Sequence, residues 1–437
     1  MAAISWGLLG PETLASERRT RTLGLGATVR AFNDLAVPGL GGVWFGKELL
    51  LATLGVAIAE RIRNSGKRAR NIEVSNAVEA LACWLALDFT GWKRDPRLRG
   101  ALKLFGKKDL SFPVVSKRNF YVTQPMRQAT VQPLRVLGLV EANGERFNAF
   151  RCTEVGVAFI DAACDDYRPH KRSVLDHLAM WAMGIHDDVK TSSELRKALS
   201  PLEPLSKSAR EFLRERIVQG TGREASRRRR VLEWVDELRD QNQQINWAAK
   251  PSIVDDLHWG DLRSGALFFA TRDAAIRLLD EIESHIGNTA DQRMCIDSGL
   301  PEPVVEKASS LRKHAHAFLD QHHDPSPALE ATMFCGECTE PVDARLLERL
   351  IVREGHVLRQ RDRDILPGIA FRGVQPSPAE AARGPEEDGA EAEVGQSIPL
   401  PEGISHRVRN IFLLNLDLCG ELDKWLTGPT ENRRAGQ

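Results

Sequence analysis

The sequence has few features that would identify a secreted protein or a membrane protein. Seven cysteines are spread over 437 residues without regular pairing, which indicates a reducing compartment rather than a disulfide framework. The longest apolar run, Leu49 to Ala59, has 11 residues, whereas a bilayer-spanning helix needs about 20. The first residues show no basic stretch followed by an apolar one, so no secretory signal is expected. These absences predict a cytoplasmic protein.

The chain also lacks a net charge, because 60 basic residues balance 60 acidic ones. The charges are unevenly distributed, however. Between Arg61 and Arg151, 18 Lys and Arg oppose 7 Asp and Glu, whereas between Leu300 and Gly403 11 oppose 19. Such asymmetry indicates polyanion binding by the first of these regions. Arg outnumbers Lys threefold, 45 to 15, which favours a GC-rich bacterial source.

Familiar catalytic motifs are missing or incomplete. No Gly-x-Ser-x-Gly elbow is present. Residues 41–47 match the G-x-x-x-x-G-K pattern of a phosphate-binding loop, but Glu48 stands where Ser or Thr would bind magnesium. Trp44 and Phe45 are also bulky for a loop that must expose its N–H groups to phosphate. We therefore expect a Gly-rich turn before a core helix, and assign no catalytic residue.

Periodicity and composition predict a mainly α, multidomain chain with no internal repeat. The expected helices lie at about 46–63, 73–87, 172–184, 192–199, 206–218, 223–245, 260–287, 302–322 and 342–354. The expected regions are an N-terminal helical region (1–108), a winged-helix-like module (109–165), a helical body (166–330), a small α/β segment (331–372), an acidic Gly/Pro-rich linker (373–403) and a C-terminal docking helix with a tail (404–437).

The stretch from Thr123 to Ile160 has the most informative pattern. Thr123 is a suitable N-cap with Pro125 in the first turn, and the apolar residues 131, 134 and 137 are expected to face inward. "GLVEANGERFNAF" predicts a hairpin around Asn-Gly. Thr153 then caps another helix, in which Gly156 allows close packing.

This order resembles the second half of the winged helix-turn-helix superfamily over about residues 115–165. The resemblance implies an embedded winged-helix module with a small β-hairpin wing beside a large helical body. Winged helices bind DNA or dock proteins, so both roles stay open. Pro133 departs from the pattern, since it falls inside the presumed recognition helix and predicts a kink, or a split after Val131.

If this module binds nucleic acid, its polar side chains would meet phosphates and base edges. The candidates are Lys117, Arg118, Thr123, Gln124, Arg127, Gln128, Thr130, Arg135 and Arg146. A second arginine cluster, residues 227–230, occupies one helical turn. Its charges are expected to form a solvated face, with a second phosphate contact as the alternative.

The spacing of Cys335 and Cys338 is compatible with half of a zinc site. His322, His323 and His356 are the candidates for a second pair of ligands. The alternative, which we favour, is that both cysteines are ordinary buried thiols. A structural zinc is the only cofactor that the sequence suggests, and the segment around the cysteines is expected to be a turn.

Taken together, these patterns predict a non-enzymatic protein that binds DNA or serves as a scaffold subunit in a bacterial multi-protein complex. A defence or mobile-element complex would suit such an architecture. The expected partners are DNA and other proteins or further copies of the chain, with no membrane. A winged-helix transcription regulator and a metal-dependent enzyme centred on Cys335 and Cys338 are the alternatives.

Overall fold

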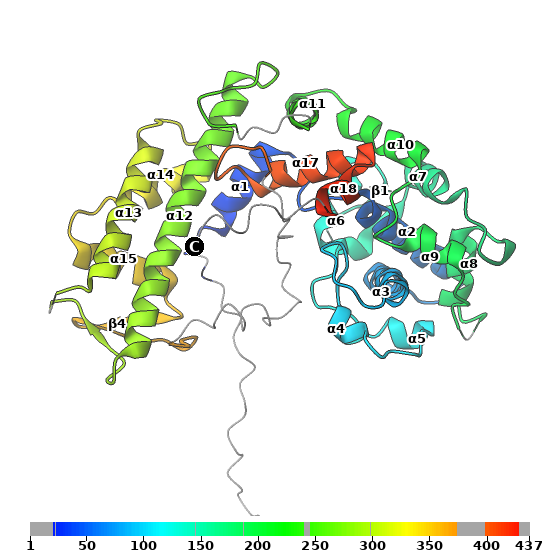
Figure 1. Cartoon of the computed structure of the whole chain (residues 1–437), viewed down its shortest axis with the longest axis horizontal. Helices are drawn as coiled ribbons and strands as arrows, with labels where there is room; N and C mark the ends of the chain where they lie inside the picture. Colours follow the sequence, from blue (N-terminus) through cyan, green and yellow to red (C-terminus); the bar gives the residue numbers. More distant parts are fainter. Residues whose placement is uncertain are drawn as a thin grey trace, which may run out of the picture. The chain divides into compact units, whose positions relative to one another are not determined.

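The computed structural model describes residues 21, 23–144, 146–186, 188–239, 245–297, 299–373 and 398–427. This part of the chain is mainly helical with two small antiparallel sheets, which confirms the expected fold class at that level (Figure 1). None of its helices combines the length and the apolar character that crossing a membrane requires. Most of the predicted acidic linker, residues 374–397, and the tail from 428 lie outside the described residues.

The chain divides into two compact units, each built from separated segments. Unit 1 comprises Met1–Phe32 and Arg263–Ala382, and unit 2 comprises Asn33–Leu262 and Arg383–Gln437. The boundaries fall inside α1 (Gly26–Ala36) and α12 (Asp256–Asn288). Segments far apart in the chain therefore pack into the same unit.

Unit 2 contains most of the helices and one strand pair. Its elements are α2 (Gly46–Asn64), α3 (Asn71–Phe89), α4 (Ala101–Leu104), α5 (Phe112–Val115), α6 (Arg127–Val136), β1 (Val140–Glu141), η1 (Phe147–Ala149), β2 (Arg151–Cys152), α7 (Glu154–Cys164), η2 (Pro169–Lys171), α8 (Val174–Ala182), α9 (Ser193–Leu199), α10 (Lys207–Val218), α11 (Arg223–Leu238), α17 (His406–Cys419) and α18 (Leu422–Thr427).

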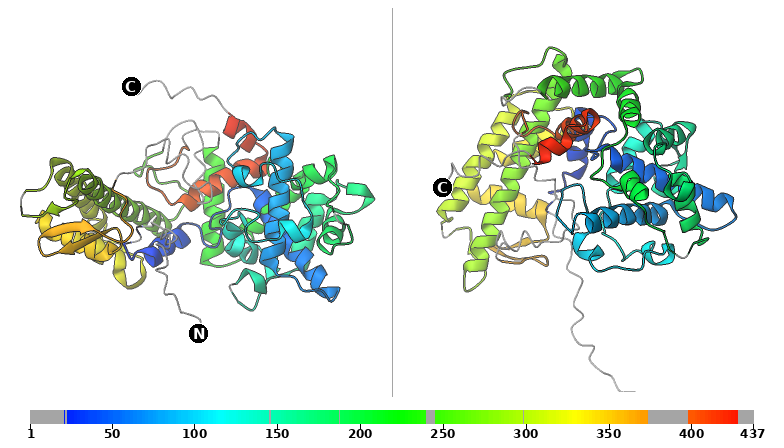
Figure 2. Two further views of the ribbon diagram at one scale, coloured as in Figure 1. Left: turned by 90° about the horizontal axis from the view of Figure 1, so that it is seen from below. Right: turned by 45° about the vertical axis from the view of Figure 1, so that its right-hand side comes forward.

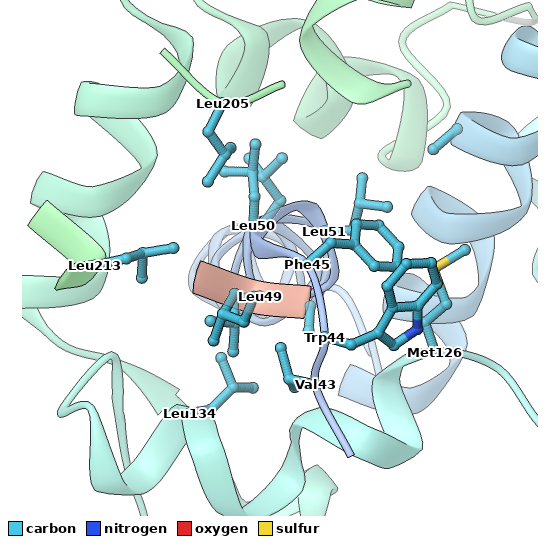
Figure 3. Packing of buried hydrophobic residues seen from close by; sticks show 14 of the residues in the cluster. Val43, Trp44, Phe45, Leu49, Leu50, Leu51, Met126, Leu134, Leu205 and Leu213 are labelled. Atoms are coloured by element: carbon cyan, nitrogen blue, oxygen red, sulfur yellow. The ribbon is translucent and has the colours of Figure 1, made fainter. Parts of the chain in front are cut away.

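The centre of unit 2 is α2, which is buried over nearly its whole length. Leucines on several of its faces meet side chains from α6, α10 and the connections around them (Figure 3). Helix α3 packs alongside α2, and the two lie in dark and light blue in Figure 2. Their close approach requires Gly55, since a Cβ there would lie 2.1 Å from the Ser75 hydroxyl. A helix that is apolar all round must be enclosed in this way.

The C-terminal helix completes unit 2. Helix α17 packs against α10, α11 and α2, and most of its residues are buried. The Leu, Ile and Phe side chains that predicted a docking helix form its inner faces, including Ile411, Phe412 and Leu414. Unit 2 therefore closes around segments more than 300 residues apart in the chain.

Unit 1 is a helical layer with a three-stranded sheet. Besides its part of α12, its elements are β3 (Met294–Cys295), α13 (Glu302–Leu319), η3 (Pro327–Leu329), α14 (Glu330–Cys338), α15 (Asp343–Glu354), β4 (Leu358–Arg361) and β5 (Asp364–Pro367). The strand order is β3-β5-β4, with Met294 opposite Ile365 and Leu358 opposite Pro367. Helix α14 replaces the predicted turn, because residues 331, 334, 335 and 338 reach one core at helical spacing.

Three local predictions around α6 were wrong. Thr123 does not cap the helix, which begins at Arg127 after Met126. Of the two outcomes expected from Pro133, the split after Val131 does not occur: α6 continues through Pro133 to Val136, and both Leu134 and Leu137 are fully buried. The strand pair joins Val140 to Cys152 across the long connection 142–150, so it is not a tight Asn-Gly hairpin.

Other local predictions of this region are confirmed. The Thr153 hydroxyl accepts a hydrogen bond from the amide of Gly156 at 3.0 Å and so caps α7. A Cβ at Gly156 would lie 2.2 Å from the Leu139 carbonyl oxygen, so only glycine permits this approach.

Residues 41–47, which match the pattern of a phosphate-binding loop, form a turn that leads into the core helix α2, as expected. The Lys47 ammonium is fully buried and donates to the carbonyl of Ala198 at 2.5 Å.

Candidate nucleic-acid interface

The start of α6 is fixed by a buried carboxylate from α3. Glu79 accepts hydrogen bonds from the amides of Met126 at 2.7 Å and Arg127 at 3.1 Å. Burial raises the pKa of Glu79 above its ordinary value, against these hydrogen bonds and the charge of Arg99. Two amides that could otherwise meet a phosphate are therefore occupied by the protein itself.

Two of the predicted contact residues face the protein rather than the solvent. The Arg127 guanidinium donates to the Asn76 side chain at 2.5 Å and lies 5.4 Å from the Phe147 ring centre. Burial lowers the pKa of Arg127. Thr130 is fully buried, and its hydroxyl donates to the carbonyl of Arg127 at 2.9 Å. Both side chains therefore join α6 to its neighbours.

The other predicted contact residues lie nearer the surface. Lys117, Arg118, Thr123, Gln128, Arg135 and Arg146 are exposed, and Gln124 is half-buried. The Gln128 amide donates to the carbonyl of Thr123 at 3.1 Å. Arg135 lies in the last turn of α6, where its positive charge is favourable beside the helix carbonyls.

One face of α6 is covered by a loop of the same unit. Gly39, at φ +75°, approaches Val136 so closely that a Cβ would lie 2.5 Å from its side chain. Gly42 meets Ala129 in the same way. Nearby, the Arg407 guanidinium donates to the Gln132 side chain at 3.2 Å. Helix α6 is therefore not free on all of its outer faces to enter a DNA groove.

A surface hollow lined mainly by basic residues lies at the turn between α2 and α3. We call residues 63–70 the basic turn. A surface hollow of about 660 Å³ is lined by Arg63, Gly66, Lys67, Arg68, Ala69, Arg70 and Glu73. The Lys67 ammonium donates to the carbonyl of Met183 at 2.6 Å, while Arg68 and Arg70 are exposed. The single acid pairs with Arg70 at 3.7 Å, in an exposed and weak ion pair.

Hydrogen bonds hold the basic turn against the connection between β1 and β2. The Asn71 amide donates to the carbonyls of Phe147 at 2.9 Å and Phe150 at 2.8 Å, and its oxygen accepts from Arg63. Exposed arginines lie within this connection at 146 and directly after it at 151. We call the set Arg63, Lys67, Arg68, Arg70, Arg146 and Arg151 the basic edge. Sequence reasoning proposed only Arg146 of these residues, although the density of charge in residues 61–70 was a visible signal.

The arginine cluster of α11 does not form the predicted solvated face. Arg227 and Arg228 are buried. Arg227 pairs with Asp261 and donates to the carbonyl of Leu35 at 2.7 Å. Arg229 donates to the carbonyl of Val218, and Arg230 pairs with an aspartate at 255. The solvated-face expectation was wrong for Arg227 and Arg228, which are enclosed by acceptors of unit 2, whereas Arg229 and Arg230 are half-buried and bonded near the surface.

The CxxC thiols lie in the core of unit 1. Cys335 and Cys338 are fully buried on α14. Burial raises the pKa of the Cys335 thiol to about 12 and also raises that of Cys338. His322 and His323 follow α13; His322 is exposed and His323 is half-buried. Within the described ranges, no group of three or more His, Cys, Asp and Glu side chains is arranged to hold a metal ion.

Comparison of the chain with protein-family models, with curated proteins and with solved structures finds no match to any of them.

Proposed function

We propose that this protein is a non-enzymatic nucleic-acid-binding subunit that holds a DNA backbone on the basic edge of unit 2. The main observation in support of this proposal is the pair of hydrogen bonds that Asn71 donates, because they hold the basic turn beside the β1–β2 connection. These hydrogen bonds bring together two segments that carry six cationic side chains between them. Helices α3, α6 and α7 with the β1–β2 pair would then act as a winged-helix-like module whose wing and turn contact phosphates.

The distribution of exposed groups favours backbone binding over base reading. Arg127 and Thr130 are engaged within unit 2, and the covering loop limits access to α6. Gln128, Gln132 and Arg135 are the exposed polar side chains of α6, and Gln132 already accepts a hydrogen bond from Arg407. Binding by such an edge gains most of its free energy from counterion release and discriminates weakly between sequences. This suits a subunit of a bacterial complex, such as a defence complex, better than a stand-alone regulator.

The test is binding of the full chain to a labelled duplex across a series of salt concentrations. Arg68→Ala with Arg70→Ala should weaken binding by roughly tenfold or more at low salt. The slope of log K against log salt should become shallower by up to about 2, since each lost phosphate contact removes about 0.9. Fluorescence anisotropy measures both quantities in one titration.

The matched control removes the same charge elsewhere. Arg359 and Arg361 are exposed on β4 of unit 1, so Arg359→Ala with Arg361→Ala changes the net charge equally. This control should leave affinity and slope close to those of the wild type. Equal losses in both double variants would reduce the effect to net charge and refute the basic edge. No affinity of the wild type for duplex or single-stranded DNA at low salt would refute nucleic-acid binding and leave protein docking.

A further inference from the structure

A second surface of unit 2 exposes aromatic rings among cationic side chains. Phe89 ends α3 and is 66% exposed, and Phe105 follows α4 and is also 66% exposed. The half-buried Trp92 packs edge-on against Phe105, with ring centres 5.1 Å apart. We call residues 89–108 the aromatic turn. The Arg196 guanidinium covers the Phe89 ring at 3.7 Å from its centre, so Phe105 is the ring of this turn that offers an exposed face, beside the half-buried Trp92.

The backbone of the aromatic turn fixes the positions of Trp92, which packs against the core of unit 2, and of the exposed Phe105. Trp92 lies at φ +63°, a conformation that is rare for a bulky residue. Its amide donates to the carbonyl of Leu87 at 2.7 Å, which fixes it at the end of α3. Gly106, at φ +73°, turns the chain directly after Phe105. Folding thus places the Trp92 and Phe105 rings before any ligand arrives, which lowers the entropic cost of binding.

The charges around these rings are complementary to a polyanion. From Asp88 to Asp109, seven Lys and Arg oppose three Asp. Lys93, Lys107 and Lys108 are exposed. Two of the acids are engaged locally, since Asp95 accepts from the Arg97 guanidinium and Asp109 accepts from an amide at 2.9 Å. The remaining field is positive, as a phosphate backbone requires.

We propose that the aromatic turn binds single-stranded nucleic acid, with bases stacked on Phe105 and Trp92 and phosphates held by Lys93, Lys107 and Lys108. Every base has a flat π-face, and stacking on aromatic side chains is the usual way in which proteins hold unpaired bases. In a duplex those faces are already stacked, so the basic edge and the aromatic turn select different forms. This inference rests on the proposed nucleic-acid function and adds the unpaired strand as its ligand.

The decisive experiment compares two labelled oligonucleotides of equal length. One is a thymidine 20-mer, and the other has the same phosphates but abasic sugars. Phe105→Ala in the full chain should weaken binding of the thymidine strand by roughly 5- to 100-fold. Binding of the abasic strand should not change. The salt slope for the thymidine strand should also stay constant, because stacking releases no counterions.

Three further variants separate stacking from charge and from general damage to the fold. Leu102 is 71% exposed in the same turn but has no π-face, so Leu102→Ala should leave binding of the thymidine strand nearly unchanged. Phe105→Trp keeps a stacking surface and should retain affinity. Lys107→Ala with Lys108→Ala should instead reduce the salt slope for both strands. Circular dichroism of each variant checks the fold.

Several results would overturn the proposal. Equal binding of the thymidine strand by wild type and Phe105→Ala would exclude stacking on Phe105. This conclusion would hold whether or not Arg68 and Arg70 contribute to duplex binding. Equal loss for thymidine and abasic strands would reduce Phe105 to a structural role. If Phe105→Ala bound anionic phosphatidylserine vesicles more weakly than the wild type does, while its binding of the thymidine strand stayed intact, the surface would be assigned to lipid. Loss of duplex binding alone in Arg68→Ala with Arg70→Ala would support the basic edge and leave this inference standing.

Discussion

Two arginine-rich segments of unit 2 look alike in sequence and differ in structure. Residues 227–230 of α11 are four consecutive arginines, and the basic turn carries four cations within residues 63–70. On α11, Arg227 and Arg228 are buried and bonded to carboxylates or carbonyls. In the basic turn, Arg68 and Arg70 are exposed at the edge of a hollow. The difference teaches that the surrounding acceptors, not the density of charge, decide whether a cluster serves packing or a ligand.

The strongest test of this comparison removes a buried charge. Arg227→Ala should lower the free energy of unfolding by about 3 kcal/mol, because Asp261 would stay buried without its main partner. The side chains of Arg227 and Asp261 are 4% and 1% exposed. Urea-induced unfolding measures the change.

Arg229→Ala is the control on the same helix, since its guanidinium bonds only carbonyls near the surface. We expect a loss below about 1 kcal/mol for this variant. If Arg227→Ala were no more harmful than Arg229→Ala, the α11 cluster would not be structural, and the contrast with the basic turn would fail.

A second test concerns a buried carboxyl group, Glu48. Burial raises the pKa of Glu48 to about 8, against the charge of Arg99 and the amide of Trp44, which donates to it at 3.0 Å. Because the folded pKa is raised, the folded state binds the extra proton between pH 4.5 and 8. The contribution of Glu48 to stability therefore falls as pH rises through that window.

Glu48→Gln should remove a few kcal/mol of this pH dependence, because a shift of one pKa unit corresponds to about 1.4 kcal/mol. The free energy of unfolding measured at pH 5 and pH 8 should differ less in the variant than in the wild type. Burial also raises the pKa of Glu79 and Asp417, so part of the dependence should remain. An unchanged difference between the two pH values would contradict a buried, protonated Glu48.

The sequence was sufficient to predict most long helices, because their apolar spacing is local information. Helices α2, α10, α13 and α15 begin within a residue of the expected positions. Helix α14 was missed because it is only nine residues long and contains Gly336 near its end. Glycine has a low helix propensity, and burial of Phe334 and Cys335 overrides it.

The candidate site was less predictable because its contacts join distant segments. Nothing in the sequence pairs Glu79 with the amide of Met126, 47 residues away, although this contact decides where α6 begins. The link from Asn71 to the carbonyl of Phe147 spans 76 residues. Charge alone identified the basic region, but only these contacts distinguish the exposed basic turn from the enclosed Arg127.

The smallest expected effect completes the comparison between the two clusters. Arg68→Ala with Arg70→Ala should change the free energy of unfolding by less than about 0.5 kcal/mol, as exposed substitutions usually do. The one ion pair lost, Arg70 with Glu73, is largely exposed and contributes little. Removing two neighbouring positive charges also relieves repulsion within the turn. Thermal and urea unfolding at low salt would detect any larger loss. Destabilisation comparable with that of Arg227→Ala would mean that the basic turn is also a packing element. Any accompanying loss of duplex affinity would then result from unfolding rather than from a missing phosphate contact.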